Sequence, residues 1–289
     1  MKKLSIPSLT VLKRKITQRG NLPHISVQEQ LNYVDQLTRF PLGRALIENR
    51  SFDTHWTDLI VSQKKYKISS NLEDFILNRS PFVIAWRELF YNFKKITQSN
   101  LHDNIIIASI PCGAMRELLD LNFSQIHNFN LIGIDIDSSS LQLAKILAKE
   151  KGLSKSLQLL QADAWNLPFT SQIDIISSCG LNIYISDKNK VLELYCQFSK
   201  ALKSGAKLIT GFLTYPPGES ETSDWNLDKI SMEDLYLENV LFKDLLQAEW
   251  RNFRTFNEIE EELKNAGFSE ITFYPDSLRV FPIVIAKKP

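Results

Sequence analysis

The 289-residue sequence contains little glycine, little cysteine and almost no net charge. Only 10 residues are glycine, which is about half the usual share of roughly 7%. Loops that hold a pyrophosphate need several glycines, because the backbone must come close to the ligand, so this scarcity argues against such a loop. The 3 cysteines have neither zinc-ligand spacing nor an even count, which favours a reduced, intracellular protein over a disulfide framework.

Neither a strongly basic surface nor a membrane span is indicated. The sequence holds 34 Lys and Arg against 33 Asp and Glu, which excludes the broadly basic surface of a general nucleic-acid binder. The stretch 121–134 carries no charge, but its Asn, Gln and His residues make it unfit for lipid, and a span needs about 20 mostly apolar residues. The basic start is followed by Pro7 and the basic cluster 13–15 without a small-residue cleavage site, so we predict an uncleaved, cytoplasmic protein.

The first hundred residues show the periodicity of helices. Apolar residues recur at helical spacing in this part of the chain, for example from Phe82 to Phe93. Ser80-Pro81 is typical of a helix start, with proline at the first helical position, and residues 71–74 are a second candidate start. We therefore predict that residues 1–102 form an N-terminal helical cap or substrate region.

Over residues 103–289, short β-branched runs alternate with helical patterns. This alternation predicts a Rossmann-like, doubly wound α/β domain with a mostly parallel sheet whose strands are buried on both faces. A helical insertion is expected over 214–254, and the last two strands predict an antiparallel C-terminal hairpin at the sheet edge. The expected strands are 105–110, 131–136, 157–160, 173–178, 207–213, 271–274 and 280–286.

Turn residues and carboxylates follow four successive strands of the predicted sheet. Ligands of open α/β sheets bind at the carboxyl ends of the strands. Gly113 follows the first strand, and Asp135 ends the second, at the spacing of about 20 residues that is typical of a ribose-binding acid. Asp163 follows the third strand, and Cys179 and Gly180 follow the fourth. Alternatively, Asp135 caps the next helix and Asp163 is an ordinary turn residue.

The loop after the first strand restricts the kind of nucleotide. A dinucleotide site uses three glycines there, and this chain keeps Gly113 alone, with Pro111 and Met115 at the flanking positions. A pyrophosphate would find too few close amides, which disfavours a nicotinamide dehydrogenase. A ligand with an adenosine and an amino-acid carboxylate but no phosphate asks less of this loop, and S-adenosylmethionine is such a ligand.

Six pieces of the sequence follow one another in the order of a known family. They are the loop 109–117, the ribose motif 133–138, the adenine motif 161–169, the fourth strand 173–178, the turn 202–208 and the tail 263–287. In this order and spacing, residues 104–289 resemble a class I S-adenosylmethionine-dependent methyltransferase. The resemblance covers about two thirds of the chain and leaves residues 1–100 unexplained.

The resemblance implies a cofactor site. Asp135 would bind the ribose hydroxyls, Asp163 the adenine amino group and the Ala164 amide the adenine ring, while loop backbone would hold the methionine part. The family often begins its loop with Glu or Asp, and Ser109 stands there instead, which weakens the expected hold on the methionine ammonium. The candidate cofactor-binding residues are Ser109, Pro111, Cys112, Gly113, Asp135, Ile136, Asp163, Ala164, Cys179 and Gly180.

The implied reaction is displacement of the sulfonium methyl by a nucleophilic O, N, C or S atom. Positioning supplies much of the acceleration in such a reaction, and a general base is needed only if the nucleophile carries a proton. The sequence indicates no particular base, and Cys112 is expected to be an apolar spacer rather than a nucleophile. The candidate substrate-facing residues are Asn182, Tyr184, Trp225, His55 and Trp56. For Tyr184, His55 and Trp56 the alternative is packing in the core.

We therefore predict a methyltransferase for a small-molecule acceptor, without a metal and without a membrane partner. The aromatic cap and insertion suit an enclosed pocket. Residues 1–28 contain six basic residues and no acidic residue, so an RNA or protein acceptor bound through this basic arm is the alternative. A non-catalytic interaction protein on the same fold is a further alternative, because of Ser109 and the missing glycines.

Overall fold

The computed structural model describes residues 8–63, 65–221 and 223–289, which form two compact units. The first unit comprises the described residues up to Ile84 together with Leu227–Arg251, and the second comprises Ala85–Asn226 and Asn252–Pro289. The chain thus divides within one helix, α6 (Pro81–Gln98), whereas the sequence pattern placed boundaries at 102 and at 214–254. Those boundaries stay a prediction.

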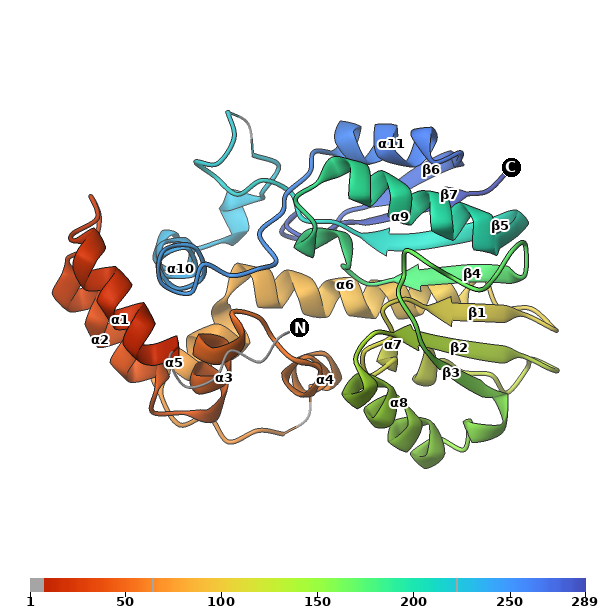
Figure 1. Ribbon diagram of the computed structural model, residues 1–289, viewed down its shortest axis with the longest axis horizontal. Coiled ribbons are helices and arrows are strands. Elements are labelled where there is room, and N and C mark those ends of the chain that lie inside the picture. Colours follow the sequence, from red (N-terminus) through yellow and green to blue (C-terminus); the bar gives the residue numbers. More distant parts are fainter. Residues whose placement is uncertain (1–7, 64, 222) are drawn as a thin grey trace. The chain divides into compact units, whose positions relative to one another are not determined.

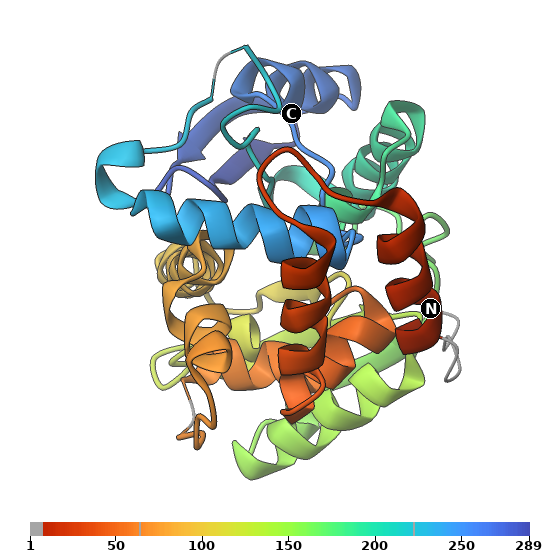
Figure 2. The same cartoon turned by 90° about the vertical axis from the view of Figure 1, so that its left-hand side faces the viewer.

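The first unit is helical, as the periodicity predicts (Figure 2). Side chains cap several of its helices: Ser26 and Glu29 form a capping box at the start of α2, and Ser70 caps α5. The elements of this unit are α1 (Ser8–Arg19), α2 (Val27–Leu37), α3 (Pro41–Asn49), α4 (Thr54–Ser62), α5 (Asn71–Asp74), the π-helix η1 (Phe75–Arg79), the 3-10 helix η4 (Leu227–Lys229), α10 (Met232–Glu238) and the π-helix η5 (Asn239–Leu245). The predicted starts at Asn71 and Pro81 are confirmed.

Contacts between distant segments hold this unit together. The Arg79 guanidinium donates to the Asp234 carboxylate at 2.9 Å from Nε, and the buried Ser80 hydroxyl donates to Glu238 at 2.7 Å. The Arg50 guanidinium donates to the Leu246 carbonyl at 3.1 Å. Residues 227–251 therefore pack with helices that lie about 150 to 200 positions earlier in the chain.

The second unit is built on a seven-stranded sheet of order β3-β2-β1-β4-β5-β7-β6 (Figure 1). The first five strands are parallel, and β7 runs antiparallel to both β5 and β6, which confirms the predicted mostly parallel sheet with an antiparallel end. The strands are β1 (Ile106–Ser109), β2 (Asn130–Asp135), β3 (Leu157–Gln161), β4 (Ile173–Ser178), β5 (Leu202–Gly211), β6 (Ser269–Tyr274) and β7 (Ile283–Lys287). Strand order reverses between β1 and β4, which is where ligands bind in such sheets.

Helices cover both faces of the sheet. On one face, α6 comes so close to β5 that a Cβ added at Gly211 would lie 2.9 Å from a Leu89 methyl. The short α7 (Arg116–Leu119) and α8 (Ser138–Glu150) follow β1 and β2. On the other face, α9 (Lys188–Ala201) and α11 (Phe256–Asn265) bury Tyr195 and Leu263 in one core with strand residues such as Ile134.

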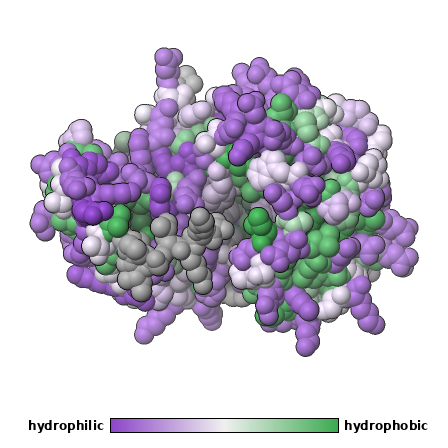
Figure 3. All heavy atoms as spheres, in the orientation of Figure 1, coloured by the Kyte–Doolittle hydropathy of each residue, from purple (hydrophilic) through white to green (hydrophobic). Residues whose placement is uncertain are grey.

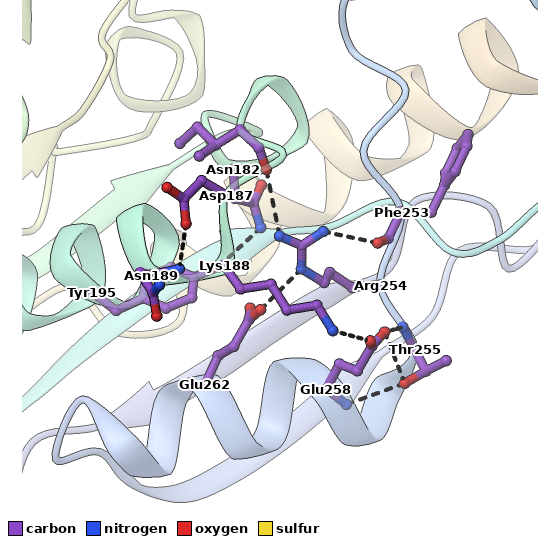
Figure 4. A network of polar contacts seen from close by, with 11 residues as sticks. Asn182, Asp187, Lys188, Asn189, Tyr195, Phe253, Arg254, Thr255, Glu258 and Glu262 are labelled. Atoms are coloured by element: carbon purple, nitrogen blue, oxygen red, sulfur yellow. Dashed lines mark hydrogen bonds and ion pairs between the residues drawn. The ribbon is translucent and has the colours of Figure 1, made fainter.

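A buried ion pair fastens α11 to the segment before it (Figure 4). The Arg254 guanidinium donates to Glu262 at 2.9 Å from Nε, and both side chains are buried. The same guanidinium donates to the carbonyls of Phe253 and Ile185. Burial raises the pKa of Glu262, and Arg254 opposes that rise. Loss of the arginine would leave a buried carboxylate without its cation, which is a costly arrangement.

We expect Arg254→Met to lower the free energy of unfolding by about 3–5 kcal/mol, the usual cost of breaking a buried ion pair. Lys264→Ala is the matched control, because Lys264 pairs with Glu260 on the exposed side of the same helix and its loss costs about 0.5 kcal/mol or less. Urea denaturation followed by circular dichroism measures both. Equal midpoints for the two variants would contradict a structural role for the buried pair.

Candidate functional site

The carboxyl ends of β1, β2 and β4 meet at one edge of the sheet. Ser109 stands in register with Gly133 on one side and with Ser177 on the other. The loop after β1 is held to the neighbouring strands, since the Cys112 N–H donates to the Ile134 carbonyl at 2.8 Å and the Ile110 N–H donates to the Ser177 carbonyl at 2.9 Å. The structure thus brings together the predicted residues that follow β1, β2 and β4.

Asp135 is buried at this edge with acceptor capacity to spare. Its carboxylate accepts the Gly113 N–H at 2.9 Å on one oxygen and the Asp137 N–H at 3.0 Å on the other, and its side chain is 8% exposed. Each carboxylate oxygen offers two lone pairs, so both oxygens can accept one bond more. Burial raises the pKa of Asp135, while its amide partners oppose the rise.

The helix-capping alternative for Asp135 is wrong. The N-cap of α8 is Asp137, whose carboxylate accepts the Ser139 N–H at 3.0 Å. Because Asp137 caps α8, the Asp135 carboxylate is available for another role.

Ile136 lies next to Asp135 in the sequence, and a second carboxylate, Asp163, follows β3, the strand that pairs with β2. Ile136 is 66% exposed, so it offers an apolar surface at this edge. Asp163 follows β3, is exposed, and accepts the Trp165 N–H at 3.0 Å on one oxygen, as the turn alternative predicts. Its other oxygen is left out of that turn. Ala164 is buried next to it.

The loops after β1 and β4 turn on glycines in left-handed backbone. Gly113 has φ +48° and Gly180 has φ +84°, and a Cβ added at Gly180 would lie 3.1 Å from the Phe281 ring. Burial raises the pKa of the Cys112 and Cys179 thiols, so both are neutral near pH 7. Pro111, beside Cys112, is half-buried.

One acid at this edge was not among the residues predicted from the sequence. Glu117 on α7 is 4% exposed and accepts hydrogen bonds from the hydroxyls of Ser109 and Ser177, the latter at 3.5 Å. Burial raises its pKa to about 7, against the effect of the two serines. The sequence carries a signal for it, because Glu117 is an acid among the apolar residues Met115, Leu118 and Leu119.

Two candidate substrate residues, Asn182 and Tyr184, lie just beyond β4, and Figure 4 shows the first of them. Asn182 is buried in the short 3-10 helix η3 (Asn182–Tyr184), and its Nδ2 donates to the Tyr195 hydroxyl at 2.9 Å. In the described part of the chain, the Asn182 Oδ1 is buried without a hydrogen-bond donor. Tyr184 is 41% exposed, and the buried Trp225 donates its indole N–H to the Thr214 carbonyl at 3.3 Å.

The remaining candidates belong to the helical unit. His55 is exposed on α4, and Trp56 is buried, with its ring edge-on to Tyr66 at 5.6 Å. In the basic arm, Lys13 pairs with Asp35, and Arg19 donates to Gln30 at 2.6 Å. Residues 1–7 of that arm, which include its first two lysines, lie outside the described residues. A substrate role for His55 and Trp56 stays a prediction.

The described residues show no grouping of three or more His, Cys, Asp or Glu side chains that would hold a metal ion. In the same residues, every helix is too short or too polar to cross a membrane. Hydrophilic side chains cover most of the face seen in Figure 3. A hollow of about 290 Å³ lies at the amino ends of β1 to β3, the edge opposite to the predicted site.

Comparison with known proteins gives one consistent family. A family model described as "Methyltransferase domain" matches residues 101–267. The ubiquinone/menaquinone biosynthesis C-methyltransferase UbiE of Campylobacter jejuni is 29% identical over 216 residues, which cover 71% of this chain and 87% of that protein.

Two solved structures extend the comparison. A structure described as "a possible exported protein" from Bordetella parapertussis is 37% identical, with a TM-score of 0.92, and the match covers 98% of this chain and 94% of that one. The S-adenosylmethionine-dependent methyltransferase SibL shares the fold, with a TM-score of 0.53 at 13% identity over 91% of this chain and 75% of that one.

The family match spans more than half of the chain and coincides with the strands that carry the predicted motifs. The chain therefore belongs to the methyltransferase domain family: it is a class I S-adenosylmethionine-dependent methyltransferase, and S-adenosylmethionine is its cofactor.

Proposed function

We propose that the protein transfers the methyl group of S-adenosylmethionine to a small-molecule acceptor. The observation that carries this proposal is the buried Oδ1 of Asn182 beside the β4 loop, which has no hydrogen-bond donor among the residues that the structure describes. A buried acceptor without a donor is unfavourable, and a polar group of a small ligand would satisfy it. The name of the Campylobacter jejuni relative, a C-methyltransferase of quinone biosynthesis, supports the same class of acceptor.

The residues at the sheet edge fit this cofactor. The spare lone pairs of Asp135 suit two ribose hydroxyls, and the exposed Ile136 offers an apolar surface to the adenine ring. The oxygen of Asp163 outside its turn suits the adenine amino group, with the Ala164 amide beside it. Backbone of Pro111–Gly113 and Cys179–Gly180 would hold the methionine part.

When bound, the cofactor would supply a methyl group on a positively charged sulfur, which an acceptor nucleophile would attack at the methyl carbon as the carbon–sulfur bond breaks and S-adenosylhomocysteine leaves. The part of this chain is to position the two reactants. Asn182 would orient the acceptor, and Tyr195 fixes the Asn182 amide by accepting its Nδ2–H bond. The thiols of Cys112 and Cys179 are unsuited as bases, because burial raises the pKa of both.

The contacts of α1 do not favour a macromolecular acceptor. Lys13 and Arg19, two of the basic residues of the arm, already have partners within their own unit. The test below nevertheless includes RNA as a possible acceptor. A cytoplasmic location, which no observation on the structure addresses, stays a prediction.

An acceptor panel tests the proposed function. The full chain is incubated with S-adenosylmethionine and separate pools of phenols and hydroquinones, amines, thiols and RNA, and S-adenosylhomocysteine is quantified. We expect release with at least one small-molecule pool and none with RNA. Turnover with RNA alone, or no cofactor consumption with any pool, would contradict the proposal.

We expect Asp135→Asn to weaken S-adenosylmethionine binding by about 10- to 100-fold, because hydrogen bonds to a charged acceptor are worth about 1.5–3 kcal/mol. Asp137→Asn is the matched control, since Asp137 caps α8 and asparagine fills that role about equally well, so cofactor affinity should stay unchanged. Isothermal titration calorimetry measures both. An Asp135 variant that binds as tightly as the unaltered protein would remove Asp135 from the cofactor site.

We expect Asn182→Leu to raise the acceptor KM about tenfold while cofactor affinity stays within about twofold, since it removes a hydrogen bond worth about 1.5 kcal/mol. Tyr195→Phe should give a smaller change in the same direction, because it only frees the Asn182 amide. Steady-state kinetics with the acceptor found in the panel measures both. An unchanged KM in Asn182→Leu would place the acceptor elsewhere.

A further inference from the structure

Glu117 occupies an unusual place in the sheet-bearing unit. It projects from α7 to the point where β1 and β4 part, and it accepts the hydroxyl hydrogens of one serine from each strand, Ser109 and Ser177. It is also almost completely buried. Glu117 therefore lies where the strand order reverses, next to the strand ends from which the loops after β1 and β4 begin.

Glu117 has no basic partner of its own in the described part of the chain. Both side-chain hydrogen bonds to it come from neutral hydroxyls, and none of the ion pairs there includes it. Taking a carboxylate out of water costs several kcal/mol, which two hydroxyl donors repay only in part. A cationic group of a ligand would supply the charged partner that this carboxylate lacks among the described residues.

The ionisable groups that act on Glu117 electrostatically, or on which it acts, are thiols and acids, and the adjacent buried Arg116 on α7 pairs with Asp120 at 3.6 Å. Cys112 lies in the loop after β1 and Cys179 in the loop after β4, and the charge of Glu117 adds to the rise in the pKa of both thiols. Asp120, the C-cap of α7, adds to the rise in the pKa of Glu117, and Asp135 at the end of β2 adds to the rise in the pKa of Cys112. Glu117 is thus within electrostatic reach of both loops predicted to hold the methionine part.

We propose that Glu117 binds the ammonium group of the methionine part of the cofactor, oriented by Ser109 and Ser177. Ser109, the last residue of β1, has no charge of its own but donates to Glu117, so α7 supplies a carboxylate at the carboxyl end of β1. This inference rests on the proposed cofactor placement and assigns one contact within it.

If Glu117 binds the ammonium group, cofactor binding is linked to the release of a proton from Glu117. Without a ligand, burial raises the pKa of Glu117 to about 7, so part of the protein carries the neutral acid at neutral pH. A bound ammonium favours the ionised form, so binding at or below pH 7 releases a proton. Affinity therefore falls as the pH drops below 7 and levels off above it.

Calorimetry on the full chain tests the proposal with two ligands. S-adenosylmethionine carries the ammonium, and 5′-methylthioadenosine lacks it but keeps the adenosine. Between pH 5.5 and pH 7 we expect the affinity for S-adenosylmethionine to rise about tenfold, because the ionised fraction of Glu117 rises by about that factor. Titrations in buffers of different ionisation enthalpy should show that binding releases a proton. The 5′-methylthioadenosine affinity, which includes any contribution of Asp135, should change by less than about twofold.

Glu117→Gln should bind S-adenosylmethionine roughly tenfold or more weakly at pH 7, lose the pH dependence and bind 5′-methylthioadenosine normally. Glu238→Gln is the matched control, because Glu238 is equally buried, accepts a serine hydroxyl and has its pKa raised to about 7, but lies in the helical unit. It should behave as the unaltered protein does.

Two results would overturn the proposal. One is equal pH dependence for both ligands in the unaltered protein, a comparison that holds even if the Glu117 variant does not fold. The other is unchanged affinity for S-adenosylmethionine in Glu117→Gln. Absence of any S-adenosylmethionine binding by the unaltered protein would instead overturn the cofactor placement itself, and this contact with it.

Discussion

The candidate site depends on the reversal of strand order between β1 and β4. Because β1, β2, β3 and β4 are parallel, the loops that follow them leave the sheet at one edge, and the reversal separates the loops after β1 and β4. Asp135 ties the first of these loops to β2 through the Gly113 N–H. Ser109 and Ser177 stand in register across the reversal, so one acid on α7 reaches both strands.

Scarce glycine is compatible with this site because few backbone positions require it. Gly113 and Gly180 supply the left-handed turns after β1 and β4, and Gly211 admits α6 against the sheet. A pyrophosphate would demand close amides along the whole first loop. A ligand made of an adenosine and an amino acid has no phosphate, so side chains at the strand ends can bind groups that loop amides would otherwise hold.

The sequence predicted best those features that depend on residues close together in the chain. The continuous apolar runs predicted the strands, and the spacing from Gly113 to Asp135 predicted two groups that the structure joins by a hydrogen bond. The packing of residues 227–251 with helices at the start of the chain rests on contacts such as Ser80 with Glu238, which no local period encodes. Glu117 was missed for a related reason: its partners, Ser109 and Ser177, come from two strands that become neighbours only in the sheet.

The chain has several buried carboxylates besides Asp135, and their partners separate the structural acids from Glu117. Glu262 has Arg254, and Asp276 accepts three backbone N–H groups in the turn before β7. Glu238 accepts a serine hydroxyl and lies far from the strand ends in sequence and in a different compact unit. Glu117 alone among these four combines neutral hydroxyl partners with a position at the edge where β1 and β4 part. A buried acid in such a place is kept at a cost in stability, and a cationic ligand is the partner that would offset that cost.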